Sequence, residues 1–145
     1  MIIEKATPGD AEALAPLMEQ LMSEPAHPDK IAQTLAQIEK NPAYYLLVAR
    51  EEGRILGTMM GIVCYDISVN CDPFMVVENV VTDTAARGKG VANALMAELE
   101  RIASEHHCTT LMLCSSIERT GAHDFYRRLG FSDTITKGFK KKVSG

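Results

Sequence analysis

Several features that mark particular classes of protein are missing from this sequence of 145 residues. None of its four cysteines is paired in a C-x-x-C motif, so neither a zinc ribbon nor a redox dithiol is indicated. No apolar run approaches the ~20 residues that cross a bilayer, and residues 1–5 lack the basic segment and long apolar stretch of a secretory signal. The net charge of −4 gives no basic excess for neutralising phosphates. We therefore expect a cytoplasmic protein with no membrane, nucleic-acid or metal partner.

The composition is that of an ordinary globular protein. Hydrophobic residues make up 46% of the chain and charged residues 23%, which excludes a disordered or fibrous protein. The sequence has no internal repeat and no low-complexity linker. Its length fits one core, so we predict a single domain over residues 1–145.

Hydrophobic patterns predict alternating strands and helices. Apolar residues at helical spacing predict helices over residues 7–22, 29–40, 89–106 and 121–129. Apolar and alternating stretches predict strands over residues 2–6, 44–50, 54–65, 74–82, 109–114 and 131–135, and a last strand that includes Phe139 and Val143. This order combines early hairpins with later crossovers and predicts a mixed sheet covered by helices, an α/β architecture in the broad sense.

The sharpest motif lies between an apolar strand and an amphipathic helix. It consists of Arg87, Gly88, Lys89, Gly90, Val91 and Ala92. Glycines let the backbone approach a ligand closely, and the start of a helix offers free N–H groups and a positive dipole end, so the segment suits a pyrophosphate. Val91 after Gly90 breaks the nucleotide-triphosphatase pattern, and Asn93 breaks the dinucleotide pattern. A tight turn without a ligand is the alternative at this point.

Three parts of the chain together resemble the GNAT superfamily of N-acetyltransferases. The pattern Arg87-x-x-Gly90-x-Ala92 resembles the pyrophosphate loop of that superfamily, and the segment 122–131, A-x-x-F-Y-x-x-x-G-F, resembles its second signature. The segment 6–11 is similar to the family's first strand–helix junction. The resemblance implies a mixed, mostly antiparallel sheet of six to seven strands flanked by about four helices.

The resemblance also implies a binding mode for acetyl-CoA. The backbone amides of residues 87–92 would hold the coenzyme A pyrophosphate. The pantetheine arm would pair with the strand at Val80, Val81 and Thr82. An N–H near Val81 would polarise the thioester carbonyl. Arg119 replaces an asparagine that contacts pantetheine in many relatives, and it is expected either near the cofactor phosphates or in solvent.

Two residues are candidates for acid–base catalysis. The resemblance makes Tyr126 the general acid that protonates the CoA thiolate, with a packing role in an aromatic core as the alternative. An amine is mostly protonated at neutral pH and needs a base before it can attack. Strict alternation would place Glu78 among Val76, Val80 and Thr82, which predicts a desolvated carboxylate suited to that task. A solvent-facing glutamate that only attracts cationic acceptors is the other interpretation.

The leading hypothesis is transfer of acetyl from acetyl-CoA to a primary amine, of a small molecule, in a ternary complex. A protein lysine or N-terminus is the alternative acceptor. The acidic segments 66–73 and 23–29 are expected to line the acceptor side, and a homodimer is expected from the relatives. Two other classes stay open: a non-catalytic acyl-CoA sensor, and a thiol enzyme that uses Cys114. His123 faces either substrate or a structural partner.

Overall fold

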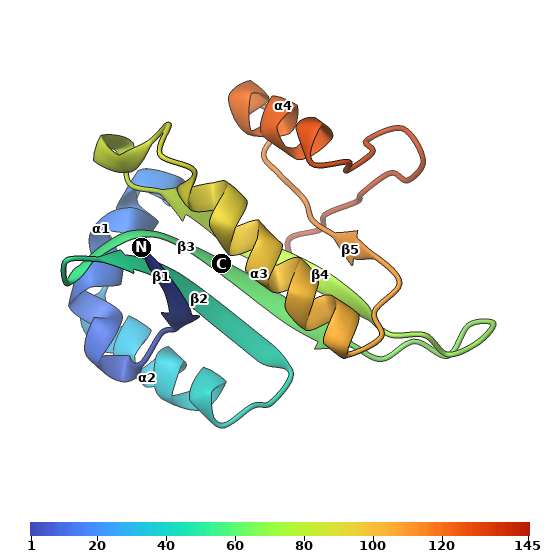
Figure 1. The fold of residues 1–145 in the computed structure, drawn as a ribbon, viewed down its shortest axis with the longest axis horizontal. Helices are drawn as coiled ribbons and strands as arrows, with labels where there is room; N and C mark the ends of the chain where they lie inside the picture. Colours follow the sequence, from blue (N-terminus) through green and yellow to red (C-terminus); the bar gives the residue numbers. More distant parts are fainter. The chain divides into compact units, whose positions relative to one another are not determined.

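The apolar segments of the chain form one open sheet (Figure 1). In the computed structural model, which describes residues 1–145, the chain forms two compact units, Met1–Leu111 and Met112–Gly145. The strands, in sheet order, are β1 (Ile2–Lys5), β2 (Tyr44–Glu51), β3 (Arg54–Cys64), β4 (Phe74–Thr82) and the two-residue β5 (Leu111–Met112). The three pairs from β1 to β4 are antiparallel, which confirms the predicted mostly antiparallel sheet.

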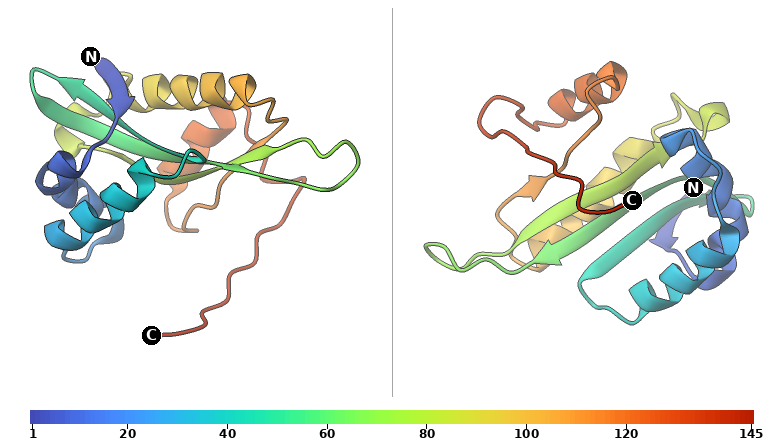
Figure 2. Two further views of the ribbon diagram at one scale, coloured as in Figure 1. Left: turned by 90° about the horizontal axis from the view of Figure 1, so that it is seen from below. Right: turned by 180° about the vertical axis from the view of Figure 1, so that it is seen from behind.

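The helices of the first unit cover both faces of this sheet (Figure 2). Helices α1 (Ala11–Met22) and α2 (Pro28–Glu39) lie on one face and α3 (Val91–Glu105) lies on the other. Leu14 of α1 and Leu35 of α2 pack with Val81 of β4 in one buried cluster. On the opposite face, Leu95 and Leu99 of α3 are completely buried. Each helix is held by its apolar stripe, because short helices are marginal without tertiary packing.

The entry into α1 is fixed by polar contacts that the sequence encodes locally. A 3₁₀ turn, η1 (Pro8–Asp10), precedes the helix, and the Thr7 N–H donates a hydrogen bond of 2.9 Å to Asp10 Oδ2. Asp10 Oδ1 accepts a second bond from Arg50 Nη2 at 3.0 Å. Burial pushes the pKa of Asp10 upward, but the Thr7 N–H and the Arg50 guanidinium together outweigh it and leave the pKa below its ordinary value.

Two glycines of β3 let α3 lie close to the sheet. A Cβ at Gly61 would come within 2.8 Å of Leu99 Cδ2 and of Met75 Sδ. A Cβ at Gly57 would come within 2.8 Å of Val91 Cγ1 and 3.0 Å of the Val81 carbonyl oxygen. Since real Cβ atoms do not approach so closely, the absence of side chains on β3 sets the distance between α3 and the strands.

Strand β4 carries a β-bulge in its second half. Thr58 pairs with Val81, but Met60 pairs with Glu78, so two residues of β4 stand opposite one residue of β3. Asn79 within the bulge has a positive φ of 55°. The bulge reverses the alternation, because Val77, before it, pairs with Gly61 on the α3 face, whereas Val81, after it, packs on the α1–α2 face.

The second unit is mainly irregular. It contains α4 (Thr120–Arg128), in which Tyr126 is buried against Phe131 with ring centroids 5.9 Å apart. The predicted strand over 131–135 and the predicted last strand are wrong, because residues 131–145 form no strand and Phe139 and Val143 are 91% exposed. Apolar side chains recur there every fourth residue, which is not the period of a strand.

The predicted sheet of six to seven strands therefore contains five. The strand predicted over 109–114 is also much shorter, at two residues. The four predicted α-helices are all present, with ends within two residues of those predicted. No helix combines the length and apolar character needed to cross a membrane.

Candidate active site

The glycine loop adopts the backbone conformation that an anion-binding helix start requires. Gly88 and Gly90 have φ values of 79° and 76°, in the left-handed region that side chains disfavour. Gly90 is the N-cap of α3, and the first helical bond runs from the Ala94 N–H to the Gly90 carbonyl at 3.0 Å. The N–H groups of the first turn before Ala94 have no partner within the helix. The loop thus offers a cradle of free donors.

The charges around this loop favour an anion. Arg87 and Lys89 are both exposed, and the first turn of α3 contains no acidic residue. No Cβ contact would limit the space beside Gly88 or Gly90, since nothing lies within 4 Å of either position. The residues predicted to hold a diphosphate therefore fit such a group in conformation, charge and access.

A hydrogen-bond network holds the chain just before the loop. The 3₁₀ turn η2 (Thr84–Ala86) follows β4, and Asp83 caps it by accepting from the Ala85 N–H at 3.2 Å. Gln20 of α1 accepts from the Thr84 N–H at 3.2 Å and donates to Asp83 at 3.4 Å. Helix α1 therefore helps to position the loop, a role that no motif in the sequence indicates.

The outer edge of β4 is open over its second half. Strand β5 has only two residues, and the Met75 N–H at the start of β4 donates to the Thr110 carbonyl at 2.9 Å. Beyond that point no strand pairs with this edge, which includes Val80 and Thr82. An extended chain bearing amides, such as pantetheine, can add to an unpaired strand edge.

The predicted surroundings of Glu78 need correction. Glu78 pairs with Met60 and shares a face with Val76, but Thr82 pairs with Gly57 and lies on the opposite face beyond the bulge. The prediction of one continuous face with Val80 and Thr82 is wrong because it assumed strict alternation through the bulge. Glu78 is also exposed rather than desolvated. Its role as a base stays a prediction.

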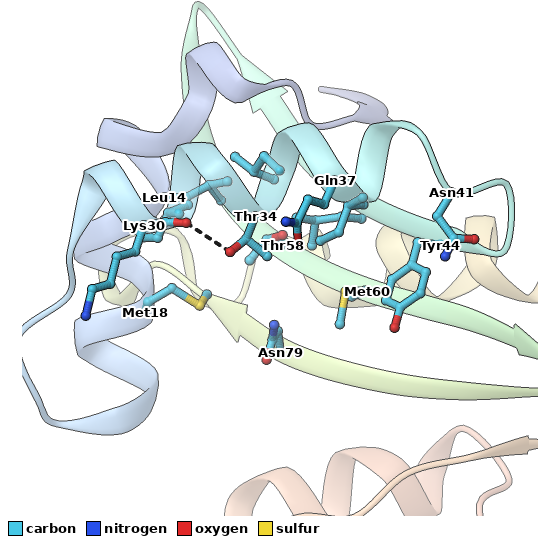
Figure 3. A pocket seen from close by; sticks show the side chains of 14 residues that line it. Leu14, Met18, Lys30, Thr34, Gln37, Asn41, Tyr44, Thr58, Met60 and Asn79 are labelled. Atoms are coloured by element: carbon cyan, nitrogen blue, oxygen red, sulfur yellow. Dashed lines mark hydrogen bonds between the residues drawn. The ribbon is translucent and has the colours of Figure 1, made fainter.

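A cavity of about 470 Å³ lies between α2 and the sheet (Figure 3). On the helix side, its wall carries a polar stripe of Lys30, Thr34, Gln37 and Asn41. These residues are spaced four, three and four apart, the interval that places side chains on one helix face. The cavity falls within the range of about 300–1,000 Å³ that is typical of small-molecule sites.

The sheet side of the cavity ends at the bulge. Tyr44, Met60 and Asn79 come from β2, β3 and β4, and Asn79 is next in the chain to Val80 of the open edge. Lys30 and Met18 lie toward one end of the cavity, and Asn41 and Tyr44 lie toward the other (Figure 3). The cavity thus reaches the part of β4 where the thioester is expected.

The acidic segments predicted to line the acceptor side do not line this cavity. None of residues 23–29 or 66–73 belongs to its wall. The Asp66 carboxylate instead accepts from the Ser68 hydroxyl at 2.8 Å and from its N–H at 3.2 Å, and these bonds lower its pKa. Sequence reasoning missed Thr34, Gln37 and Asn41, although their spacing on a predicted helix was a usable signal.

The remaining predicted residues belong to the second unit. Tyr126 is 6% exposed and packs against Phe125 and Phe131, which is consistent with the packing role and does not test the acid role. Arg119 is half-buried and is the N-cap of α4. His123 Nε2 lies 2.8 Å from the Ser116 carbonyl oxygen, and since a carbonyl only accepts, Nε2 carries the proton. This bond favours a structural role for His123.

Cys114 is exposed, and no hydrogen bond joins it to a histidine. No group of three or more His, Cys, Asp or Glu side chains is arranged to hold a metal ion. The thiol-enzyme hypothesis thus gains no support from the arrangement of side chains around Cys114.

Comparison with known families identifies the class of protein. Residues 12–131 match the Acetyltransferase (GNAT) family, so the chain belongs to that family and is an acyltransferase. Enzymes of this family use acetyl-CoA. A comparison with curated protein sequences finds no significant match.

Solved structures show the same fold. A proposed acetyltransferase from Agrobacterium tumefaciens strain C58 is 26% identical and has a TM-score of 0.90, with 99% of this chain and 100% of that chain covered. A transcriptional regulator from Bacillus halodurans C-125 is 25% identical, also with a TM-score of 0.90 and with 98% and 99% covered. AAC(6')-Iy, solved in complex with the bisubstrate analogue CoA-S-monomethyl-acetylneamine, is 24% identical, with a TM-score of 0.80 and with 99% and 98% covered.

Proposed function

We propose that this protein transfers the acetyl group of acetyl-CoA to the primary amine of a small molecule. The observation that carries the proposal is the cavity of about 470 Å³, which reaches the β4 bulge at Asn79, beside the open strand edge. A closed hollow of this size suits a small acceptor. A protein lysine or N-terminus, the alternative acceptor, would be better served by an open groove.

The cofactor is held, in this proposal, by the loop and the strand edge. The free N–H groups over residues 87–92 accept the diphosphate, and Arg87 and Lys89 add positive charge. Val80, Val81 and Thr82 provide the backbone with which pantetheine pairs. Arg119 is proposed to lie near the cofactor. The bisubstrate analogue bound by AAC(6')-Iy contains CoA, which supports a CoA site in this fold.

The chemistry is a direct transfer between the two substrates in a ternary complex. The free amine attacks the thioester carbonyl, a new C–N bond forms, and the C–S bond breaks. Glu78, or a water that it holds, takes the proton from the amine, and Tyr126 gives a proton to the departing thiolate. An N–H near Val81 stabilises the oxyanion. The products are an N-acetyl amide and CoA.

The test measures acceptor-dependent release of CoA thiol from acetyl-CoA over a panel of small amines, with CoA affinity measured separately by calorimetry. Release that depends on an amine is expected. CoA binding without any such release would instead support the non-catalytic sensor. Turnover of a lysine peptide but of no small amine would support the protein acceptor. The homodimer and the cytoplasmic location stay predictions.

Replacing Glu78 tests the proposed base. A Glu78→Gln variant keeps the size and polarity of an exposed side chain, so the fold and CoA affinity should be unchanged. The rate should fall by about tenfold to a thousandfold if Glu78 removes the proton. A loss that raising the pH restores would point to base catalysis, because free amine then forms without help, whereas an unchanged rate would exclude the role.

A further inference from the structure

The cavity that we assign to the acceptor contains no carboxylate. Of the side chains in its wall, Lys30 is the only one charged at neutral pH, and all the others are neutral or apolar. Lys30 forms no ion pair with any acidic residue of the chain. A molecule in the cavity therefore meets one uncompensated positive charge and no fixed negative one.

Several neutral polar groups in the wall are uncommitted. The side-chain amides of Gln37 and Asn79 and the hydroxyl of Tyr44 make no hydrogen bond within the protein. Asn41 uses its Oδ1 to accept from the Ala43 N–H at 3.0 Å, which leaves its NH₂ group free to donate. These groups can hydrogen-bond to carbonyl, hydroxyl or carboxylate oxygens of a ligand.

The positions of these groups give the cavity a direction. Lys30 lies at one end, and Asn79 faces it from the sheet at the β4 bulge, where the amine must react (Figure 3). From Lys30 to Gln37, α2 rises about 10 Å. Between them the wall is mainly apolar, with Ile31 and Leu35 on α2 and Leu14 on α1.

From this arrangement we infer that the acceptor is a monoamine whose apolar body ends in an anionic group, and that Lys30 determines this specificity. The inference rests on the proposed function. One exposed carboxylate, Glu78, lies opposite Met60 near the reacting end and serves a single amine. A second ammonium group deep in the cavity would face Lys30 without a counter-charge. Burying an unpaired charge is unfavourable, so polyamines and polycationic sugars are poor acceptors.

Three six-carbon amines test the inference because they differ only at the far end. These are 6-aminohexanoate, hexylamine and 1,6-diaminohexane, with an anionic, an apolar and a cationic terminus. With saturating acetyl-CoA, kcat/KM for CoA release should fall in that order, by at least tenfold from first to last. A preference for 1,6-diaminohexane would overturn the inference.

Three variants assign the effect to the cavity wall. Lys30→Gln should remove the advantage of 6-aminohexanoate over hexylamine, and Gln37→Glu should raise 1,6-diaminohexane relative to 6-aminohexanoate by at least tenfold. Lys40→Gln is the matched control, because Lys40 lies just past the end of α2 and outside the cavity wall, so its ratios should equal the wild-type ratios. Ratios unchanged by both wall variants would overturn the inference, as would turnover of other amines but of none of these three. No CoA release with any amine would overturn the proposed function instead.

Discussion

Replacing Gly90 by aspartate, with asparagine as the matched control, separates the charge of the loop from its shape. Both side chains have nearly the same size, and both tolerate the left-handed backbone better than other residues do. Gly90 has a φ of 76°, and a Cβ there meets nothing within 4 Å. The two variants should therefore fold alike, with similar small losses of thermal stability.

The difference between the two variants can be estimated from electrostatics. A carboxylate about 5 Å from one phosphate charge raises the free energy of binding by about 0.8 kcal/mol at a dielectric constant of about 80 and by about 3 kcal/mol at about 20. Since 1.4 kcal/mol corresponds to a factor of ten, the Asp variant should bind CoA about 4- to 200-fold more weakly than the Asn variant. Raising the ionic strength should narrow the gap, because exposed charges are screened.

Calorimetric titration with CoA at low and high salt measures this difference, and thermal melts of both variants provide the folding control. Dephosphorylated pantetheine is a second ligand for the comparison, since it lacks the diphosphate and should not distinguish Asp from Asn. Equal CoA affinities for the two variants and the wild-type protein would refute the assignment of the diphosphate to the start of α3.

The remaining predictions concern one catalytic and two structural residues. Tyr126→Phe should lower kcat by about tenfold to a hundredfold and leave the Kd for CoA unchanged, because only a hydroxyl is removed; equal losses in both would make Tyr126 structural. Gly57→Ala should cost about 1–3 kcal/mol in urea unfolding and weaken CoA binding, because the new Cβ lies 2.8 Å from the first residue of α3; Gly121→Ala, with open space around it, is the neutral-to-stabilising control. Asp10→Asn should cost about 1–3 kcal/mol at pH 7. Because the pKa of Asp10 is lowered in the folded protein, its contribution is present above the unfolded pKa of about 3.9 and is lost as the pH falls toward the lower folded value. Urea curves at pH 7 and near pH 3 should show the gap between the wild-type protein and Asp10→Asn closing, and a gap independent of pH would contradict this reasoning.

Local signals were sufficient to predict most of the first unit. The helix over 29–40 and the strand over 74–82 follow from period and from the prolines around them, and both match the structure closely. The glycine loop was also predictable, because Gly88 and Gly90 are the residues that a left-handed backbone before a helix selects. These features depend on neighbours in the chain, and the sequence displays them directly.

Features that depend on distant partners were not predictable. The bulge at Asn79 is set by pairing with β3, and nothing in β4 alone shows that Val81 has changed face relative to Val77. The cavity likewise exists only where α2 meets the sheet, so the segment Asp66 to Pro73 was favoured for its charge rather than its position. The missing strands after Phe131 show that exposed apolar residues without a partner do not form a sheet.

The break in β4 divides one strand into two regions with separate constraints. Positions before it are fixed by the tight packing of β3 against α3, and Val81 beyond it is fixed by the buried cluster with α1 and α2. Asn79 at the break is exposed and answers to neither. An enzyme of this design can exchange the residue that meets its acceptor while the framework that carries the coenzyme is left intact, so new acceptors can be acquired through one substitution at a position that folding does not need.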